Sequence, residues 1–359
     1  MINGRLSHYA TAKCVNINYQ SFQDSRFPAF SDLFYVYKPP NSILLMSPSF
    51  TRRQTLAALT ASVGASLSTD PLESILVPTA QAPFTICLNM STIRGHKLGF
   101  VKELETASKA GFRSVEIWIE TLQTYLKTGA TTADARKVLA DNGIKVENAI
   151  GFAPWIVDDE SARAKGLEQL KSEMEMLAQI GCRRVATPPI GAQSAGSPKV
   201  DLYKAAERYR AILELGDKTG VVPQLELWGF SPNLSRLSEV MFVAIESSHP
   251  SARVLLDIYH LYKGSSGSVS LPLVGKPAIE VFHVNDYTAD FPRDKITDAD
   301  RVFPGDGVAP IRDTLKLIKR TDMPIVVSLE VFNKTYYAQD AQTVAKTAMT
   351  KMKAMVDGL

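Results

Sequence analysis

The chain has 359 residues, of which 45% are hydrophobic and 21% charged, as in an ordinary globular protein with a large core. Its net charge of +3 is too small and too dispersed to indicate a protein that binds nucleic acid or a membrane surface. Three widely spaced cysteines, Cys14, Cys87 and Cys182, form neither a disulfide framework nor a CxxC metal motif. We therefore expect no nucleic-acid partner and no structural zinc site of the cysteine type.

The first 82 residues differ in pattern from the rest of the chain. Residues 1–45 show no sustained periodicity, and we assign them no fold. From Met46 onward, the pair Arg52–Arg53 precedes a short Ala-rich run that resembles a twin-arginine export signal. This run is too short and too polar to span a bilayer stably. The triplet Ala80–Gln81–Ala82 has the small-x-small form of a cleavage site, although Pro83 directly after it is unfavourable.

This pattern divides the chain into three parts. Residues 1–45 precede the signal, which indicates that translation begins at Met46. Residues 46–82 form the signal, and residues 83–359 form a single folded domain. We expect a protein that is periplasmic or otherwise exported; if the arginine pair is incidental in a disordered arm, the protein is cytoplasmic.

From Phe84 onward, short apolar runs alternate with amphipathic segments of helical length. The expected strands are Phe84–Leu88, Ser114–Trp118, Lys145–Ile150, Arg184–Thr187, Pro223–Leu227, Val254–Asp257, Val281–Val284 and Ile325–Glu330. The expected helices are Leu98–Ala110, Ala133–Asn142, Ala162–Ile180, Leu202–Thr219, Ser235–Ile245, Leu271–Ile279, Ile311–Lys319 and Ala338–Val356. This α/β alternation predicts a (β/α)8 TIM barrel. The alternative is an open doubly wound sheet, but no GxGxxG follows the first strand and no P-loop occurs.

Polar residues stand at the ends of most of these strands. In a parallel α/β barrel the active site lies at the carboxyl ends of the strands, so we expect these side chains at one rim. In chain order they are Asn89 and Ser91, Glu116 and Trp118, Glu147 and Asn148, Thr187, Glu226 and Trp228, Asp257 and His260, His283 and Asp286, and Glu330. They are densest on the last four strands.

The last four strands deliver Glu226, Asp257, His283 and Glu330. A buried charge has to be paired, hydrogen-bonded or bound to a metal, so four such groups at one level indicate a shared site. Three carboxylates and one imidazole suit one divalent ion, Mn²⁺, Mg²⁺ or Co²⁺, in octahedral geometry with two positions for substrate oxygens. Zn²⁺ is compatible but more typically recruits further His or Cys ligands. The alternative is that each residue is an ordinary rim residue bridged by Lys or Arg.

Four short segments carry a family resemblance: Leu-Glu226-Leu-Trp, Leu-Asp257-Ile-Tyr-His260, Phe-His283-Val-Asn-Asp286 and Ser-Leu-Glu330. As an ordered set they resemble the xylose isomerase-like barrels of sugar isomerases and epimerases. That superfamily includes the ketose 3-epimerases, inosose dehydratase and endonuclease IV. The resemblance extends from Phe84 to the C-terminus.

The resemblance implies roles for individual residues. Glu226, Asp257, His283 and Glu330 are the implied metal ligands. Glu226 and Glu330 are also the implied acid/base pair on opposite faces of a substrate carbon. His260 is the implied contact to a substrate hydroxyl.

Further candidate substrate contacts follow from the loops and the rim. The segment Asp300–Gly307 resembles the PGDG loop of the superfamily, where a nearby arginine reaches substrate, and this makes Arg301 a candidate. In the ketose 3-epimerases an arginine follows the histidine within a few residues, whereas this chain has Ala289 and Asp290 there. The remaining candidates are the rim residues Asn89, Glu116, Trp118 and Asp286, and an aromatic pocket wall of Trp118, Phe152, Trp155 and Trp228.

The expected function is a divalent-metal-dependent isomerase or epimerase acting on a sugar or polyol. A metal polarises the carbonyl and stabilises a cis-enediolate, while one carboxylate removes the α proton and another, or the same one, returns it. A lyase or dehydratase acting on a keto-sugar or inosose uses the same chemistry, and a non-catalytic sugar-binding barrel is a further alternative. An endonuclease IV-like zinc cluster needs more histidines than His260 and His283. No Lys or Arg cluster marks a phosphate site, which favours unphosphorylated substrates, and the resemblance implies a homo-oligomer.

Overall fold

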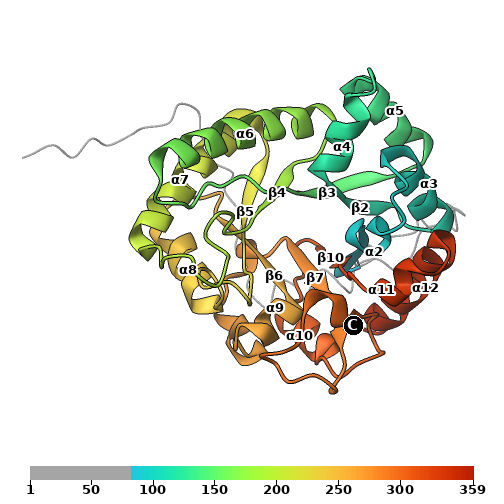
Figure 1. Ribbon diagram of the computed structural model, residues 1–359. Coiled ribbons are helices and arrows are strands. Elements are labelled where there is room, and N and C mark those ends of the chain that lie inside the picture. Colours follow the sequence, from blue (N-terminus) through green and yellow to red (C-terminus); the bar gives the residue numbers. More distant parts are fainter. Residues whose placement is uncertain (1–81) are drawn as a thin grey trace, which may run out of the picture. The chain divides into compact units, whose positions relative to one another are not determined.

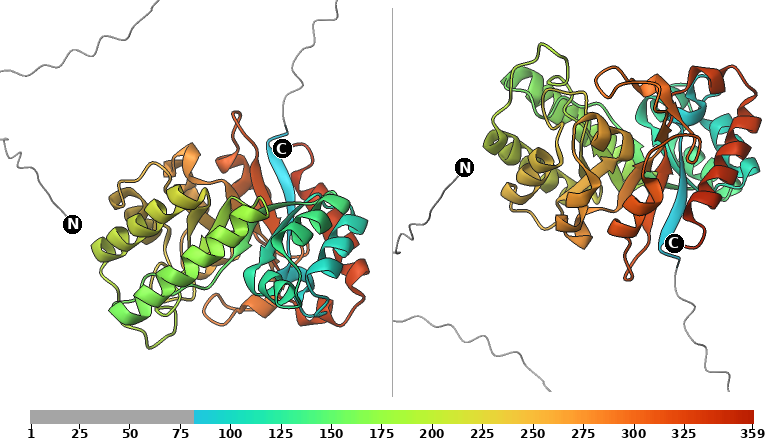
Figure 2. Two further views of the ribbon diagram at one scale, coloured as in Figure 1. Left: turned by 90° about the horizontal axis from the view of Figure 1, so that it is seen from above. Right: turned by 90° about the horizontal axis from the view of Figure 1, so that it is seen from below.

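The structure is a computed structural model that describes residues 82–359. The expectations for residues 1–45 and for the export signal up to residue 81 lie outside the described residues. In the described part, eight parallel strands close a barrel in the order β1-β10-β7-β6-β5-β4-β3-β2. Helices surround this barrel, as seen along its axis in Figure 1 and from two sides in Figure 2. The predicted TIM barrel is confirmed.

The strands agree closely with those expected from the sequence. They are β1 (Phe84–Asn89), β2 (Ser114–Trp118), β3 (Lys145–Ile150), β4 (Arg184–Thr187), β5 (Val222–Glu226), β6 (Arg253–Asp257), β7 (Val281–Val284) and β10 (Ile325–Leu329). The first and last strands pair in parallel from Phe84 opposite Ile325 to Leu88 opposite Leu329, which closes the barrel. Two short strands, β8 (Asp286–Tyr287) and β9 (Arg301–Val302), form a separate antiparallel ribbon.

The helices pack around the outside of the barrel. They are α2 (Ser91–Arg94), α3 (Phe100–Ala110), α4 (Ile119–Leu126), α5 (Thr132–Asp141), α6 (Glu160–Gln179), α7 (Leu202–Thr219), α8 (Leu237–Glu246), α9 (Ile258–Lys263), α10 (Ile311–Ile318), α11 (Lys334–Tyr337) and α12 (Ala341–Val356). Local sequence sets their limits: α7 begins where the Asp201 side chain accepts the Lys204 N–H, and it ends at Gly220 with φ 76°. Among residues 82–359, no helix has the length and apolar character needed to cross a bilayer.

The helix expected at Leu271–Ile279 does not form. Two 3-10 segments, η1 (Ser268–Leu273) and η2 (Lys276–Ala278), take its place. Pro272 lies inside the first segment and Pro277 inside the second. Because proline has no N–H and clashes with the preceding turn, two prolines five residues apart prevent a regular α-helix.

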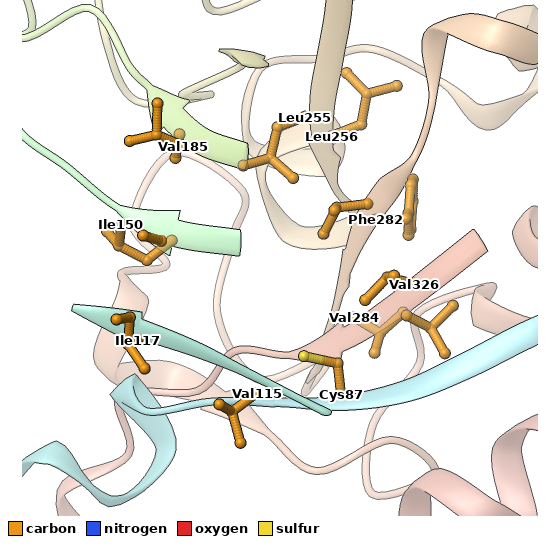
Figure 3. Close-up of a cluster of buried hydrophobic side chains, with 14 of the residues drawn as sticks. Cys87, Val115, Ile117, Ile150, Val185, Leu255, Leu256, Phe282, Val284 and Val326 are labelled. Carbon is orange, nitrogen blue, oxygen red and sulfur yellow. The ribbon is translucent and has the colours of Figure 1, made fainter. Parts of the chain in front are cut away.

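The core lies between the strands and the helices, and Figure 3 shows part of it. In β2, Val115 and Ile117 are buried among apolar neighbours, while Glu116 between them points to the opposite face of the strand. Each fully buried aliphatic side chain of this kind stabilises the fold by about 1.5–3 kcal/mol. The period of two therefore supplies both the outer core and the polar groups of the barrel interior.

Candidate active site

A chain of polar side chains crosses the interior of the barrel. Gln224 Nε2 donates to Asn148 Oδ1 at 3.4 Å, and Asn148 Nδ2 donates to Glu116 Oε1 at 2.7 Å. Glu116 Oε2 lies 2.9 Å from His283 Nε2. The four residues come from β5, β3, β2 and β7 and are buried. The interior is thus a hydrogen-bonded polar layer that orients the imidazole.

Three of the four predicted metal ligands converge. Asp257 at the end of β6, His283 in β7 and Glu330 directly after β10 each offer a ligand atom, and these atoms lie within 4.8 Å of one another. His283 Nδ1 is 3.3 Å from Glu330 Oε2 and 3.9 Å from Asp257 Oδ2. Glu226, the fourth predicted ligand, is outside this group, but its Oε2 is buried without a hydrogen-bond partner. The convergent atoms and this unpaired oxygen fit a site for a divalent cation.

The start of helix α9 holds the Asp257 side chain in place. Asp257 is the N-cap of α9, where its Oδ1 accepts the N–H groups of Tyr259 at 2.6 Å and His260 at 3.0 Å. Its Oδ2 accepts Asn285 Nδ2 at 3.0 Å. Capping through one oxygen therefore leaves the other for side-chain partners, 3.9 Å from His283 Nδ1.

Asn89, at the end of β1, links two carboxylates of the site. Its Nδ2 donates to Glu116 Oε2 at 3.1 Å and to Glu330 Oε1 at 3.0 Å, while its Oδ1 accepts Trp118 Nε1 at 3.3 Å. The predicted contacts Asn89 and Glu116 thus lie behind the ligand group, where they orient Glu330 and His283.

The electrostatic environment separates the two glutamates. Burial, which outweighs the attraction of His283, raises the pKa of Glu226 to about 8, and the negative charge of Glu330 acts in the same direction. Burial also opposes ionisation of Glu330, but His283 and Arg301 hold its pKa well below the usual value. In the metal-free chain, the surroundings therefore favour the protonated form of Glu226 and the ionised form of Glu330.

The two histidines at the site also differ. Burial lowers the pKa of His283, but the charges of Glu116 and Glu330 outweigh burial and hold this pKa well above its usual value. Burial together with the nearby Arg301 lowers the pKa of His260 to about 3, so this imidazole is neutral. A neutral imidazole can both donate and accept hydrogen bonds to a hydroxyl group.

A cavity of about 170 Å³ opens beside these groups. Its lining is Trp118, Ile150, Phe152, Glu226, Trp228, Phe230, His260, Asp298, Arg301, Glu330 and Phe332. The aromatic rings contact one another: Phe152 is 5.2 Å from Trp118 and 6.4 Å from Trp228 between ring centres. The cavity therefore combines an aromatic wall with carboxylates, one imidazole and one guanidinium.

Arg301 reaches the cavity from the β8/β9 ribbon and is buried. Its Nη1 lies 2.8 Å from Glu330 Oε2 and 3.1 Å from Asp257 Oδ2. Its Nη2 lies 3.1 Å from His260 Nε2 and also pairs with Asp298. The predicted candidates Arg301 and His260 therefore lie side by side at the cavity.

Two predicted contacts lie elsewhere. The Asp286 carboxylate accepts backbone N–H groups of Tyr287, Gly305 and Ala309 at 2.8–2.9 Å and holds the PGDG loop against β8. Trp155 is fully buried, donates to the carbonyl of Pro188 and packs on Tyr209. Neither residue lines the cavity.

Sequence reasoning missed four residues that line the cavity: Ile150, Phe230, Asp298 and Phe332. Phe332 follows Glu330 by two residues, a spacing that could have identified it, because β10 and its continuation run to the rim. Asp298 carries no such signal, since it lies in a short 3-10 segment, η3 (Asp298–Asp300), of a long loop.

Comparisons with known proteins agree with the fold. A sequence family described as xylose isomerase-like TIM barrel matches residues 104–355. Inosose isomerase of Bacillus velezensis is 26% identical over 275 residues, which are 76% of this chain and 96% of that protein. The crystal structure of the IOLI protein with a bound zinc atom superimposes with a TM-score of 0.68 at 23% identity, covering 76% of this chain and 98% of that one. The structure of D-psicose 3-epimerase, solved in the presence of D-fructose, gives a TM-score of 0.61 at 17% identity. This similarity covers 76% of this chain and 100% of that one.

Proposed function

Because this chain belongs to the xylose isomerase-like TIM barrel family, we propose that it is a divalent-metal-dependent isomerase or epimerase of an unphosphorylated sugar or cyclic polyol. The observation that carries the proposal is the convergence of Asp257, His283 and Glu330 within 4.8 Å, beside a cavity that Glu226 and Glu330 line. The similarity to inosose isomerases makes a cyclic polyol ketone the first substrate class to test.

Asp257, His283 and Glu330 would hold the cation, with Glu226 as a further ligand or as a proton donor. A divalent cation at this position supplies Lewis-acid polarisation of a substrate carbonyl. Glu330 lines the cavity, and its carboxylate would accept the proton from the carbon next to that carbonyl. Glu226, whose pKa burial raises to about 8 in the metal-free chain, would return a proton from its own wall of the cavity.

The two glutamates approach the cavity from different walls. Glu226 ends β5 and Glu330 follows β10, and in the closed sheet β6 and β7 stand between these strands. Acid and base groups from separate strands suit a reaction that removes a proton at one position and delivers it at another. His260 and the guanidinium of Arg301, which both line the cavity, would bind substrate hydroxyl groups.

The charge of the cavity supports an unphosphorylated substrate. Three carboxylates, Glu226, Asp298 and Glu330, line it, and its guanidinium Arg301 is already paired with Asp257, Glu330 and Asp298. In the metal-free chain, a phosphate group would face Asp298 and Glu330 while the guanidinium of Arg301 is held by carboxylates. The aromatic wall, in contrast, suits the apolar C–H face of a sugar or cyclitol ring.

The test is proton exchange on a defined substrate set. Chelator-treated protein is reloaded with Mn²⁺, Mg²⁺, Co²⁺ or Zn²⁺ and incubated in D₂O with inososes and ketohexoses, followed by NMR and product analysis. We expect metal-dependent deuterium incorporation with an isomer or epimer as product, and its loss in Glu330→Gln. Net loss of water would instead assign a dehydratase, and absence of exchange with every substrate and metal would contradict the proposal.

A further inference from the structure

Arg301 contacts the carboxylates of the candidate cation site as well as the cavity. Its Nη1 lies 2.8 Å from Glu330 Oε2 and 3.1 Å from Asp257 Oδ2. These are the same two oxygens that His283 Nδ1 approaches, at 3.3 and 3.9 Å. The guanidinium therefore bonds to the oxygens that this group would offer to a metal.

The other end of the guanidinium has partners of its own. Nη2 pairs with Asp298 and lies 3.1 Å from His260 Nε2. The central carbon lies 4.3 Å from the centre of the Tyr259 ring and 5.3 Å from that of Phe332. Asp298 and the two rings can retain the guanidinium after Nη1 has left its carboxylates.

Two cations on one pair of buried carboxylates repel each other strongly. Asp257 and Arg301 are each 1% exposed and Glu330 is 4% exposed, so water screens their charges little. In the metal-free chain, the guanidinium and the nearby His283 ring together offset two carboxylates whose burial alone would be costly. The arrangement favours either the guanidinium or a metal ion on these oxygens.

We propose that Arg301 is the internal counter-ion of the metal site and that it competes with the divalent cation for Asp257 and Glu330. Asp298 is its positioning residue, which retains the guanidinium at the cavity when the cation displaces Nη1. The inference rests on the metal site of the proposed function and adds a two-position role for Arg301. In this role, cation binding frees Nη1 to bind a substrate oxygen.

The sign of one affinity change tests the proposal. Mn²⁺ and Zn²⁺ are titrated calorimetrically into the chelator-treated full-length chain, as wild type and as Arg301→Met. Because the competitor is removed, we expect the variant to bind about 5- to 150-fold more tightly, the usual range of coupling between two sites. A guanidinium that only holds the carboxylates in position would give the opposite sign, and unchanged or weaker binding would overturn the proposal.

Arg94→Met is the matched control for removal of a positive charge. Arg94 stacks on the cavity residue Trp118 at 3.8 Å and pairs with the exposed Glu120, and no bond joins it to the ligand group. We expect its metal affinity to stay within about twofold of wild type, as for an exposed charge. Equal tightening in both arginine variants would show a general charge effect and would overturn the competition.

A second variant keeps the test decisive if Arg301→Met does not fold. Asp298 is 42% exposed at its side chain, so Asp298→Asn should preserve the fold. The displaced guanidinium then lacks its charged partner, and we expect metal binding to weaken roughly two- to fivefold. Asp294→Asn removes an equal charge from the same loop, where Asp294 pairs with Lys295, and it should leave the affinity unchanged. Equal affinities of the two asparagine variants would overturn the proposal.

The outcomes separate this inference from the proposed function. No metal uptake by the wild-type chain would overturn both. Uptake by the wild type without tighter binding in Arg301→Met, or without weaker binding in Asp298→Asn, would overturn the inference and leave the metal-dependent function standing.

Discussion

His283 has different neighbours at its two ring nitrogens, and this difference defines the site. Glu116 lies 2.9 Å from Nε2, while Nδ1 approaches Asp257 and Glu330. A carboxylate behind a metal-binding histidine fixes the ring orientation and increases its basicity. Glu116, which the strand-end pattern places among the substrate contacts, is therefore better described as the group that orients His283.

Replacing His283 tests the ligand group directly. His283→Ala removes the one nitrogen ligand of the group and leaves only the carboxylates of Asp257 and Glu330. Loss of a group that merely hydrogen-bonds to a metal ligand costs about 10–100-fold in metal affinity. We therefore expect the affinity for Mn²⁺ or Zn²⁺ to fall by more than about 100-fold. Metal analysis and calorimetry of the reloaded protein measure the change. His249→Ala is the control, because His249 pairs with Asp217 in a turn and should leave binding intact. Wild-type affinity in His283→Ala would remove His283 from the site.

The sequence points to the charged residues of the candidate site more readily than to their surroundings. Glu226, Asp257, His283 and Glu330 stand out because charged groups rarely end buried apolar runs. Asp286 has the same signature, but its carboxylate accepts N–H groups from a loop about 20 residues away, at Gly305 and Ala309. Such a long-range backbone partner leaves no trace in local sequence, so a structural carboxylate and a substrate contact look alike.

At the scale of elements, the loop after β5 and the helix α9 are in close backbone contact. A Cβ on Gly229 would lie 2.2 Å from the His260 carbonyl oxygen and 2.6 Å from the Gly264 nitrogen. Because neither backbone atom can move without shifting α9, the glycine allows Trp228 and His260 to line one cavity.

Gly229→Ala should therefore perturb both stability and substrate binding. We expect a loss of about 1–3 kcal/mol in the free energy of unfolding, the usual cost of overpacking, and a raised KM because His260 shifts away from Arg301. Denaturant unfolding and steady-state kinetics measure the two effects. Gly267→Ala is the matched control: a Cβ there meets no atom within 4 Å, and stability should change by less than about 0.5 kcal/mol. Equal behaviour of the two variants would contradict the close contact.

Helix α3 contains a buried carboxyl group that makes stability depend on pH. Burial raises the pKa of Glu103 to about 7, and Arg94 offsets only part of this effect. The folded state therefore holds a proton that the unfolded state releases near its ordinary pKa of about 4.3. Stability linked to Glu103 is present at acidic pH and is lost as pH rises towards and through 7.

Glu103→Gln removes this proton linkage. We expect the variant to match the wild type near pH 4 and to exceed its free energy of unfolding by on the order of 1–3 kcal/mol at pH 8. Unfolding curves at several pH values provide the measurement. Glu105→Gln on the same helix only breaks an ion pair with Lys109 at the surface, so it should show no such pH dependence. A constant difference between Glu103→Gln and wild type at all pH values would contradict the buried acid.

Strands were more predictable than helices in this chain. Ser114–Trp118, Lys145–Ile150, Arg184–Thr187 and Val281–Val284 have the bounds expected from the sequence, because short β-branched and apolar runs between glycines and charges have few alternatives. The helix expected at Leu271–Ile279 was wrong. The apolar spacing of this segment is helical, but Pro272 and Pro277 favour tighter turns. Here the backbone chemistry of proline outweighed the side-chain pattern.

At the scale of the whole molecule, cation binding should stabilise the barrel. A ligand that binds only the folded state at 100 times its Kd adds about 2.7 kcal/mol, which for a domain of this size corresponds to a rise of the melting temperature on the order of 5 °C. Thermal unfolding with chelator and with saturating metal measures the rise. His283→Ala should show no difference between the two conditions; an equal rise in that variant would place the bound metal elsewhere.

The pairing of β1 with β10 also dictates when the site can exist during biosynthesis. Phe84 and Ile325 are partners across the closing seam, and Glu330 directly after that seam bonds to Asn89 of the first strand. A nascent chain must therefore emerge from the ribosome at least as far as Glu330 before its sheet closes. The candidate ligand group is completed only when β1 pairs with β10, so a cation bound there would stabilise this closing pair of strands. Metal uptake by newly made protein would thus report, in real time, the completion of the fold.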